Sequence, residues 1–169
     1  MTYAFPPGGL PDQSVSPEGT AVFTPAYAVL PAVTQRDIVT SYLPGWTGMR
    51  MWVLARPMSG FAETFSQYAV ELSPAGGSDA PEVDDEVQSV IFVAAGQVTL
   101  NIDGRRHVLE TGGYAYIPAD AVWTIWNDSD AISQFHWIRK RYVAADGVDL
   151  PEAFVTSDRE VAPIEMPDC

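Results

Sequence analysis

The sequence has 169 residues, of which 47% are hydrophobic, 11% aromatic and 18% charged. This is enough apolar material for one packed domain, and the length is too short for two complete ones. The 22 acidic side chains outnumber the 9 lysines and arginines and give a formal net charge of -13, which argues against nucleic acids and anionic membranes as partners, because both are also negatively charged.

The cysteine content and the ends of the chain point to the cytoplasm. The single cysteine, Cys169, cannot form a disulfide within the chain. The N-terminus lacks the basic and apolar regions of a signal peptide, and no segment approaches the ~20 apolar residues of a membrane span. We therefore expect a cytoplasmic protein.

Short runs rich in β-branched and aromatic residues follow a proline- and glycine-containing segment, residues 1–20, that we expect to be an extended arm. The runs predict strands at residues 22–30 (an edge strand, because of Pro25), 36–43, 50–56 and 64–72. Residues 74–86 predict an irregular loop, since their prolines and glycines oppose a regular ladder.

The second half of the pattern predicts strands at 87–95, 98–102, 105–110, 114–117, 122–126 and 132–139. Asp103 and Gly104 predict a two-residue hairpin turn, because both tolerate positive φ. Roughly ten short strands indicate an all-β barrel or sandwich, which we place at residues 21–145. Residues 146–169 predict an acidic linker or tail, with at most a helical turn at 151–155.

Residues 112–127, GGYAYIPADAVWTIWN, have the spacing of a known signature, G-x5-P-x-G-x2-H-x3-N. The stretch therefore resembles the cupin superfamily. That resemblance implies a cupin-type antiparallel β-barrel, a jelly-roll-like double-stranded β-helix. Asp120 stands where the signature has glycine, and Trp123 stands where it has a metal-binding histidine.

The other cupin signature, G-x5-H-x-H-x3 or 4-E-x6-G, aligns when its last glycine is Gly96. Its glutamate then falls on Ser89, and its two histidines fall on Val83 and Asp85 or, in the other register, on Glu82 and Asp84. A divalent metal needs three or four converging imidazole or carboxylate ligands, so we expect no metal site and no catalytic residue in this chain.

Three residues remain as candidate ligand contacts inside the barrel: Ser89, Trp123 and His136. We expect Trp123 to fill the space of the absent metal and histidine, with the wall of an apolar ligand pocket as the alternative. His136 alternates with Gln134 and Ile138 and could point inward, whereas His107 is expected at the surface.

Charged residues cluster in two further places. The acidic residues of 79–86 are expected to form a solvated loop rather than a cation site, because they lack the ligand spacing of a calcium loop. The basic run at 139–141 is expected to be a solvated strand end.

A longer stretch, residues 36–72, carries a closer resemblance, together with VFTPAYAVLP before it and IRKRY after the barrel. These segments resemble the N-terminal half of the (S)-ureidoglycine aminohydrolases of allantoin breakdown. The resemblance implies a bicupin that releases ammonia from ureidoglycine to give ureidoglycolate. It also implies a homo-oligomer, with manganese and the substrate site in a C-terminal barrel that is missing here.

The resemblance thus implies the non-catalytic N-terminal cupin of such an enzyme, inactive alone, whose partner is the C-terminal cupin barrel. Two origins would explain a chain with the N-terminal cupin alone: a truncated reading frame, which we favour, and a separately encoded subunit. Two alternatives stay open: a metal-free cupin that binds a small acid or ureide, and a structural subunit that pairs with a catalytic cupin.

Overall fold

The computed structural model describes residues 21–24, 27–32, 42–57 and 64–162. The expected arm at 1–20, residues 36–41 of the second predicted strand and residues 163–169 of the tail lie outside the described residues. The chain divides into two compact units, residues 1–38 and 39–169. Among the described residues, no helix has the length and apolarity needed to cross a membrane.

In the first unit, strand β1 (Val22–Phe23) pairs antiparallel with β2 (Ala28–Val29). The turn between them is held by the amide of Thr24, which donates to the carbonyl of Tyr27 at 2.8 Å. The prediction of one strand over 22–30 is therefore wrong, because the chain reverses direction within this range and makes a small hairpin.

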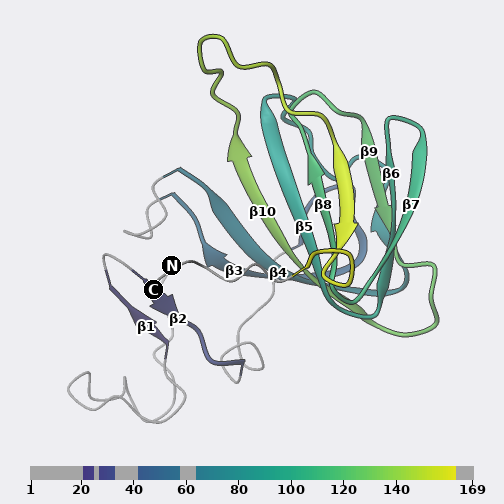
Figure 1. The fold of residues 1–169 in the computed structure, drawn as a ribbon. Helices are drawn as coiled ribbons and strands as arrows, with labels where there is room; N and C mark the ends of the chain where they lie inside the picture. Colours follow the sequence, from purple (N-terminus) through teal and green to yellow (C-terminus); the bar gives the residue numbers. More distant parts are fainter. Residues whose placement is uncertain (1–20, 25–26, 33–41, 58–63, 163–169) are drawn as a thin grey trace. The chain divides into compact units, whose positions relative to one another are not determined.

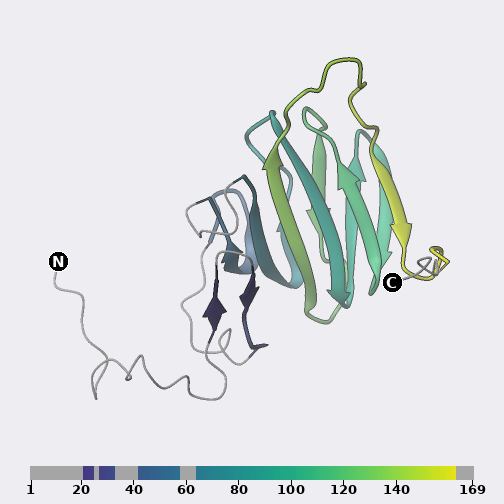
Figure 2. The ribbon, with the colours of Figure 1, turned by 60° about the vertical axis from the view of Figure 1, so that its left-hand side comes forward.

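The second unit is a nearly closed antiparallel barrel, and the predicted all-β barrel is confirmed (Figure 1). Its sheet has the strand order β11-β8-β5-β10-β4-β9-β6-β7, with β3 paired to β4 (Figure 2). The strands are β3 (Thr47–Ala55), β4 (Ser66–Ser78), β5 (Val87–Ala95), β6 (Gln97–Ile102), β7 (Arg105–Glu110), β8 (Gly113–Ile117), β9 (Trp123–Trp126), β10 (Ser133–Arg141) and β11 (Phe154–Ser157).

The hairpin between β6 and β7 has the predicted turn. Asp103 and Gly104 adopt positive φ values of 49° and 80°. The Oδ1 of Asp103 accepts a hydrogen bond from the amide of Val122 at 3.0 Å, so the turn is also tied to the chain segment that enters β9.

Strand β4 corrects the predicted loop at 74–86, because it continues to Ser78. The strand pairs with β10 as far as Leu72 and with β3 as far as Gly77, which also pairs with Trp126 of β9. A Cβ on Gly77 would overlap the carbonyl oxygen of Ile125 and the Trp126 ring. The absence of a side chain at Gly77 therefore lets β4 pass close to β9. Glycine in this segment thus permits a close approach of two strands, where the sequence had suggested a loop.

Strand β11 corrects the predicted helical turn at 151–155. Phe154 pairs with Tyr116 of β8, and Thr156 pairs with Tyr114. Val155 points the other way and packs against the core. The β-branched residues suit a half-buried strand better than a helix, and the partner strand decides the outcome.

The core lies inside the barrel and is formed by alternate residues of nearly every strand. Its fully buried side chains include Trp137, Phe135, Leu72, Ile91, Leu100, Leu109, Ile117 and Ile125. Asn127, the last position of the signature at residues 112–127, is also fully buried. Its Nδ2 donates to the carbonyls of Leu72 and Ala131 at 3.0 and 2.7 Å, so this residue joins β4 to the turn before β10.

Candidate functional site

The signature positions converge on Trp137, a fully buried residue of β10. Ser89, which stands at the signature glutamate, accepts a hydrogen bond from the Nε1 of Trp137 at 3.0 Å. Trp123, which stands at the signature histidine, meets Trp137 edge to face with ring centroids 6.0 Å apart. The rings of Trp46 and Tyr68 pack on the same indole at 5.5 and 5.7 Å.

Trp137 was not among the residues singled out from the sequence. The available signal was the alternation of β10, in which Ser133, Phe135 and Trp137 share the buried face. The expectation that Trp123 is a core residue agrees with its 5% exposure. The interior beside the signature positions is occupied by a cluster of aromatic rings around Trp137, within a core that is otherwise largely aliphatic.

A partly buried ion pair covers one side of this cluster. The Arg139 guanidinium lies 5.0 Å from the Trp137 ring centre, in cation–π geometry. It binds Glu82 through two hydrogen bonds, from Nε to Oε2 at 2.5 Å and from Nη2 to Oε1 at 2.6 Å. The Glu82 side chain is only 6% exposed. A bidentate contact of this kind fixes both the position and the orientation of the Glu82 carboxylate.

Two further carboxylates of the acidic loop are paired with an arginine. Arg141 forms ion pairs with Asp84 at 3.1 Å and with Glu86. The predictions of a solvated acidic loop and a solvated basic strand end are therefore wrong for Glu82 and Arg139. The reason is topological: β10 ends beside the loop that leads into β5, so the two opposite charge runs face each other.

Beside this loop lies a pocket of about 200 Å³. Five acidic residues line it, together with Trp123: Asp79, Glu82, Asp84, Asp85 and Asp120. Glu82 and Asp84 use their carboxylates on arginines, and the Oδ1 of Asp79 accepts a hydrogen bond from the Trp126 indole at 3.0 Å. Three of the five are thus already engaged by the protein itself.

The backbone conformation at Asp120 explains why the signature has glycine at this position. Its φ is 63°, in the left-handed region that glycine adopts freely and that aspartate and asparagine tolerate better than most residues. The turn into β9 therefore keeps its shape with a different residue, although the backbone is less favourable than with glycine.

His136 lies on the opposite face of β10 from Trp137. Its cross-strand partners are Ala69 and Phe92, and its neighbours Phe135 and Trp137 are the ones that enter the core. The barrel thus brings Ser89 and Trp123 together around one indole and leaves His136 outside. Among the described residues, no group hydrogen-bonds the buried Nδ1 of His136.

His107 lies on β7 and lines two surface pockets of about 440 and 500 Å³. Residues of β11, including Val155, form the other side of both. These strands are the two ends of the sheet order, so the pockets mark the side where the barrel is not closed by hydrogen bonds. The side chains in this seam are of mixed charge.

The residues at the signature positions do not fit a divalent metal such as manganese. Ser89 offers a hydroxyl that already accepts a hydrogen bond, and Trp123 offers an indole, which has no lone pair for a metal. Nor does the described part of the chain contain a group of three or more His, Cys, Asp or Glu placed to hold a metal ion.

Comparisons with known proteins agree with this architecture. Residues 69–139, which run from β4 to β10, match the Cupin domain family. The (S)-ureidoglycine aminohydrolase of Escherichia coli K12 is 27% identical over 115 residues, which is 68% of this chain and 43% of that enzyme.

Two solved structures resemble most of the chain. The putative glyoxylate induced protein of Pseudomonas aeruginosa is 54% identical, with a TM-score of 0.82, over 91% of this chain and 58% of that one. Protein Ylba of E. coli is 25% identical, with a TM-score of 0.75, over 84% of this chain and 57% of that one. The chain thus spans about half the length of these relatives, and its barrel is a cupin barrel with the cupin domain at residues 69–139.

Proposed function

We propose that this chain is the non-catalytic cupin half of an (S)-ureidoglycine aminohydrolase, and that it supports a second, metal-bearing cupin barrel as its partner. The observation that carries the proposal is the filled barrel interior. At two of the signatures' ligand positions, Ser89 and Trp123, the side chain bonds to Trp137 or packs against it, so the scaffold of a cupin site is kept while these two ligands are not. The likeness to the E. coli enzyme supplies the substrate.

The chemistry of the reaction supports this division of labour. Releasing ammonia from ureidoglycine needs an amine leaving group and an attacking water held at one carbon. A site for this needs an open, polar cavity with acid or base groups at hydrogen-bond distance. Around the signature positions Ser89 and Trp123, the interior of this barrel offers packed aromatic rings and the Ser89 hydroxyl instead. In our proposal manganese and the reacting groups belong to the partner barrel.

The first test uses the purified chain alone. Ammonia release from fresh ureidoglycine is followed with and without added Mn²⁺, and bound metal is measured by elemental analysis. We expect neither turnover nor stoichiometric metal. Turnover by this chain alone, or about one manganese per chain, would overturn the proposal.

The second test asks for the supporting role. The chain is co-expressed with the part of the E. coli relative that lies outside the match, provided as a separate polypeptide. We expect the two to co-purify and to release ammonia from ureidoglycine. Failure of the second barrel to gain solubility or activity would count against the partnership.

The alternative of a metal-free ligand-binding cupin makes a different prediction. It requires Ser89, Trp123 and His136 to contact one ligand, whereas His136 lies on the other face of β10. A thermal-shift screen across ureides and small organic acids measures this, since a ligand that binds the folded chain raises its melting temperature. We expect no shift.

A further inference from the structure

The sequence contains two Asp-Gly pairs, Asp103-Gly104 and Asp146-Gly147, and the fold places them in different surroundings. An aspartate before a glycine is prone to rearrange, because glycine has no side chain to shield its amide nitrogen. Whether such a pair reacts depends on whether its backbone is free to bring the aspartate carboxyl to that nitrogen. The two pairs therefore provide a comparison within one molecule.

The first pair, Asp103-Gly104, is held from two sides. Its flanking residues, Ile102 and Arg105, pair with each other across the hairpin of β6 and β7. The amide of Asp103 donates to the carbonyl of Val122 at 2.8 Å, and the Oδ1 of Asp103 accepts from the amide of Val122 at 3.0 Å. The carboxylate is thus bound to the segment that enters β9, and it reaches the Gly104 nitrogen only if this bond breaks and the turn opens.

The second pair, Asp146-Gly147, has weaker restraints. It lies in the connection between β10 and β11, where residues 143–153 are exposed and belong to no strand. A bond from the amide of Val148 to the carbonyl of Ala145, at 3.1 Å, closes its turn. In the described part of the chain, no hydrogen bond or ion pair holds the Asp146 carboxylate. A Cβ on Gly147 would meet nothing within 4 Å, and the same holds for Gly104, so hydrogen bonds rather than steric access distinguish the two pairs.

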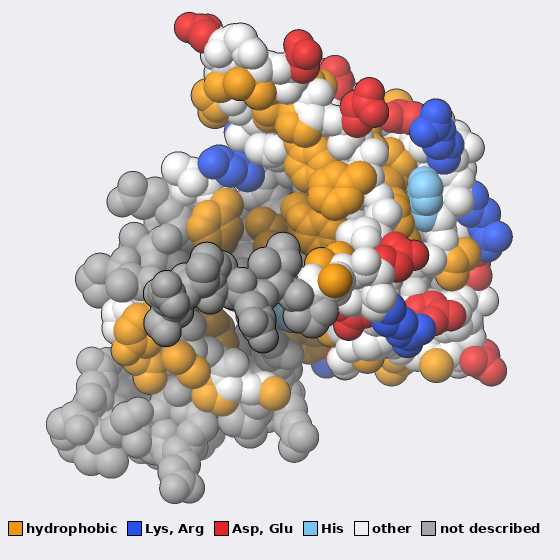
Figure 3. Space-filling view, viewed as in Figure 1, with side chains coloured by type: hydrophobic (Ala, Val, Ile, Leu, Met, Phe, Trp, Pro, Cys, Tyr) orange, Lys and Arg blue, Asp and Glu red, His pale blue; other side chains and the backbone are white. Residues whose placement is uncertain are grey.

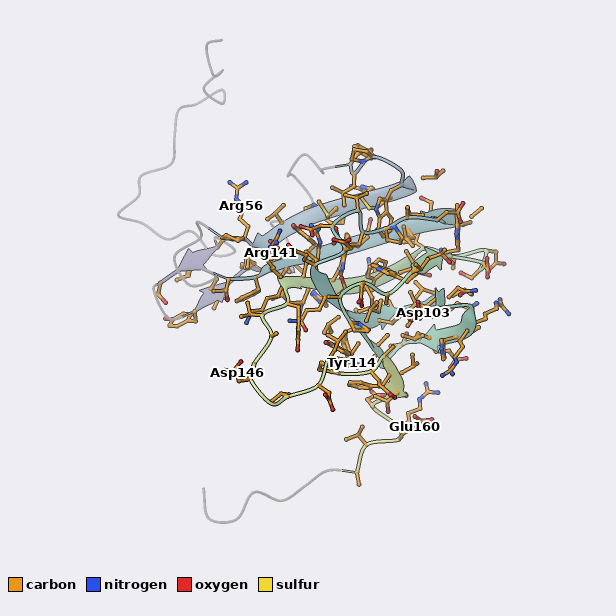
Figure 4. All side chains as sticks on the ribbon, turned by 90° about the horizontal axis from the view of Figure 1, so that it is seen from above. Arg56, Asp103, Tyr114, Arg141, Asp146 and Glu160 are labelled. Carbon is orange, nitrogen blue, oxygen red and sulfur yellow. The ribbon has the colours of Figure 1, made fainter. Side chains whose placement is uncertain are left out.

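The figures show the two locations. The loop between β10 and β11 projects beyond the ends of the strands, with acidic side chains along its tip (Figure 3). In the view from above, Asp146 lies on this loop apart from the strands, whereas Asp103 lies beside them (Figure 4). A projecting loop changes conformation at little cost, because few contacts are lost when it moves.

We propose that Asp146 is a modification site, at which the folded chain converts aspartate to isoaspartate without an enzyme. The amide nitrogen of Gly147 attacks the Cγ of Asp146, and a water molecule leaves with one carboxyl oxygen and the amide proton, which closes a succinimide ring. Water then adds to either ring carbonyl. Addition at Cγ restores aspartate, and addition at the main-chain carbonyl gives isoaspartate. Water is lost and regained, and no other reactant is consumed.

The position of the pair also determines what the product does to the fold. Isoaspartate lengthens the backbone by one methylene group and keeps the negative charge. At Asp146 the extra methylene lies in the connection between β10 and β11, outside the strand pairings of the barrel. At Asp103 it would lie in the turn of the β6–β7 hairpin and disturb its register. The barrel can therefore accumulate the modification at Asp146 while it stays folded.

The experiment ages the purified full chain at pH 7.4 and 37 °C for four weeks, with a parallel sample unfolded in guanidinium chloride. Trypsin releases residues 142–159, because it cuts after Arg141 and Arg159, and electron-transfer fragmentation gives ions specific to isoaspartate at each position. In the folded chain we expect isoaspartate at Asp146 to form at least about tenfold faster than at Asp103. In the unfolded sample, where neither turn persists, the two rates should agree within about threefold.

Asp146→Glu is the matched variant, since glutamate keeps the charge and the exposure but would need a larger ring to react. This variant should form no such product at position 146 and should leave the rate at Asp103 unchanged. Equal rates at the two pairs in the folded chain overturn the proposal, as does an Asp146 that stays intact in the folded chain while the unfolded sample converts. The measurement needs neither ureidoglycine nor a partner barrel, so its failure and that of the proposed function are distinguishable.

Discussion

The ion pair between Arg139 and Glu82 gives the sharpest stability prediction. Arg139→Met keeps most of the aliphatic stem but removes the guanidinium that faces a carboxylate only 6% exposed. Leaving a buried charge without its partner costs about 3–5 kcal/mol, and the lost contact with Trp137 adds to this cost. Because the Arg139 side chain is 26% exposed and water can reach the pair, we expect a loss of about 3 kcal/mol.

The assay is urea unfolding at pH 7, followed by tryptophan fluorescence. Arg106→Met is the matched control, since Arg106 pairs with Asp128 at 3.2 Å with side chains 64% and 51% exposed. An exposed pair of this kind is worth about 0–1 kcal/mol. Glu82→Gln combined with Arg139→Met completes a double-mutant cycle, and we expect about 1–3 kcal/mol of coupling.

The reasoning fails if Arg139→Met costs no more than Arg106→Met, or if the cycle shows no coupling. Either result would mean that the acidic loop is held open to solvent and that the pair does not close the barrel over Trp137.

Three further predictions concern single residues. Burial, and then the neighbouring Tyr142 and Tyr114, raise the pKa of Tyr116 above its ordinary value of 10.0. Folding therefore favours the neutral Tyr116 phenol. The stability that this phenol contributes is complete below pH ~10 and is lost as the pH rises through the raised pKa. The urea midpoints of the natural chain and of Tyr116→Phe should therefore converge at alkaline pH. Asn127→Ala leaves the Leu72 carbonyl without its buried amide donor and should lower the free energy of unfolding by about 1–3 kcal/mol in the same urea assay, whereas equal stability would show that water replaces the amide. Asp120→Val places a β-branched residue at a φ of 63° and should cost about 1–2 kcal/mol, while Asp120→Gly should be neutral or better; the reverse order of melting temperatures would contradict this.

The barrel could be predicted from the sequence because the signals for its strands and turns are local. The alternation of strands such as β5 and β7 and the Asp103-Gly104 turn depend on residues close together in the chain, and both strands have the predicted bounds. Prediction failed where partner strands decide the outcome. The glycines of β4 were read as a loop although they allow a close crossing, and β11 was missed because its strand forms only against β8.

The candidate site divides in the same way. The sequence by itself predicted that the signature glutamate and one signature histidine are replaced, since this needs only the identity of Ser89 and Trp123. Only the tertiary structure decided what takes their place. Trp137 meets both because β5, β9 and β10 surround one interior, and Arg139 meets Glu82 although 57 positions separate them. Such contacts depend on the closing of the sheet, which no local pattern in the chain encodes.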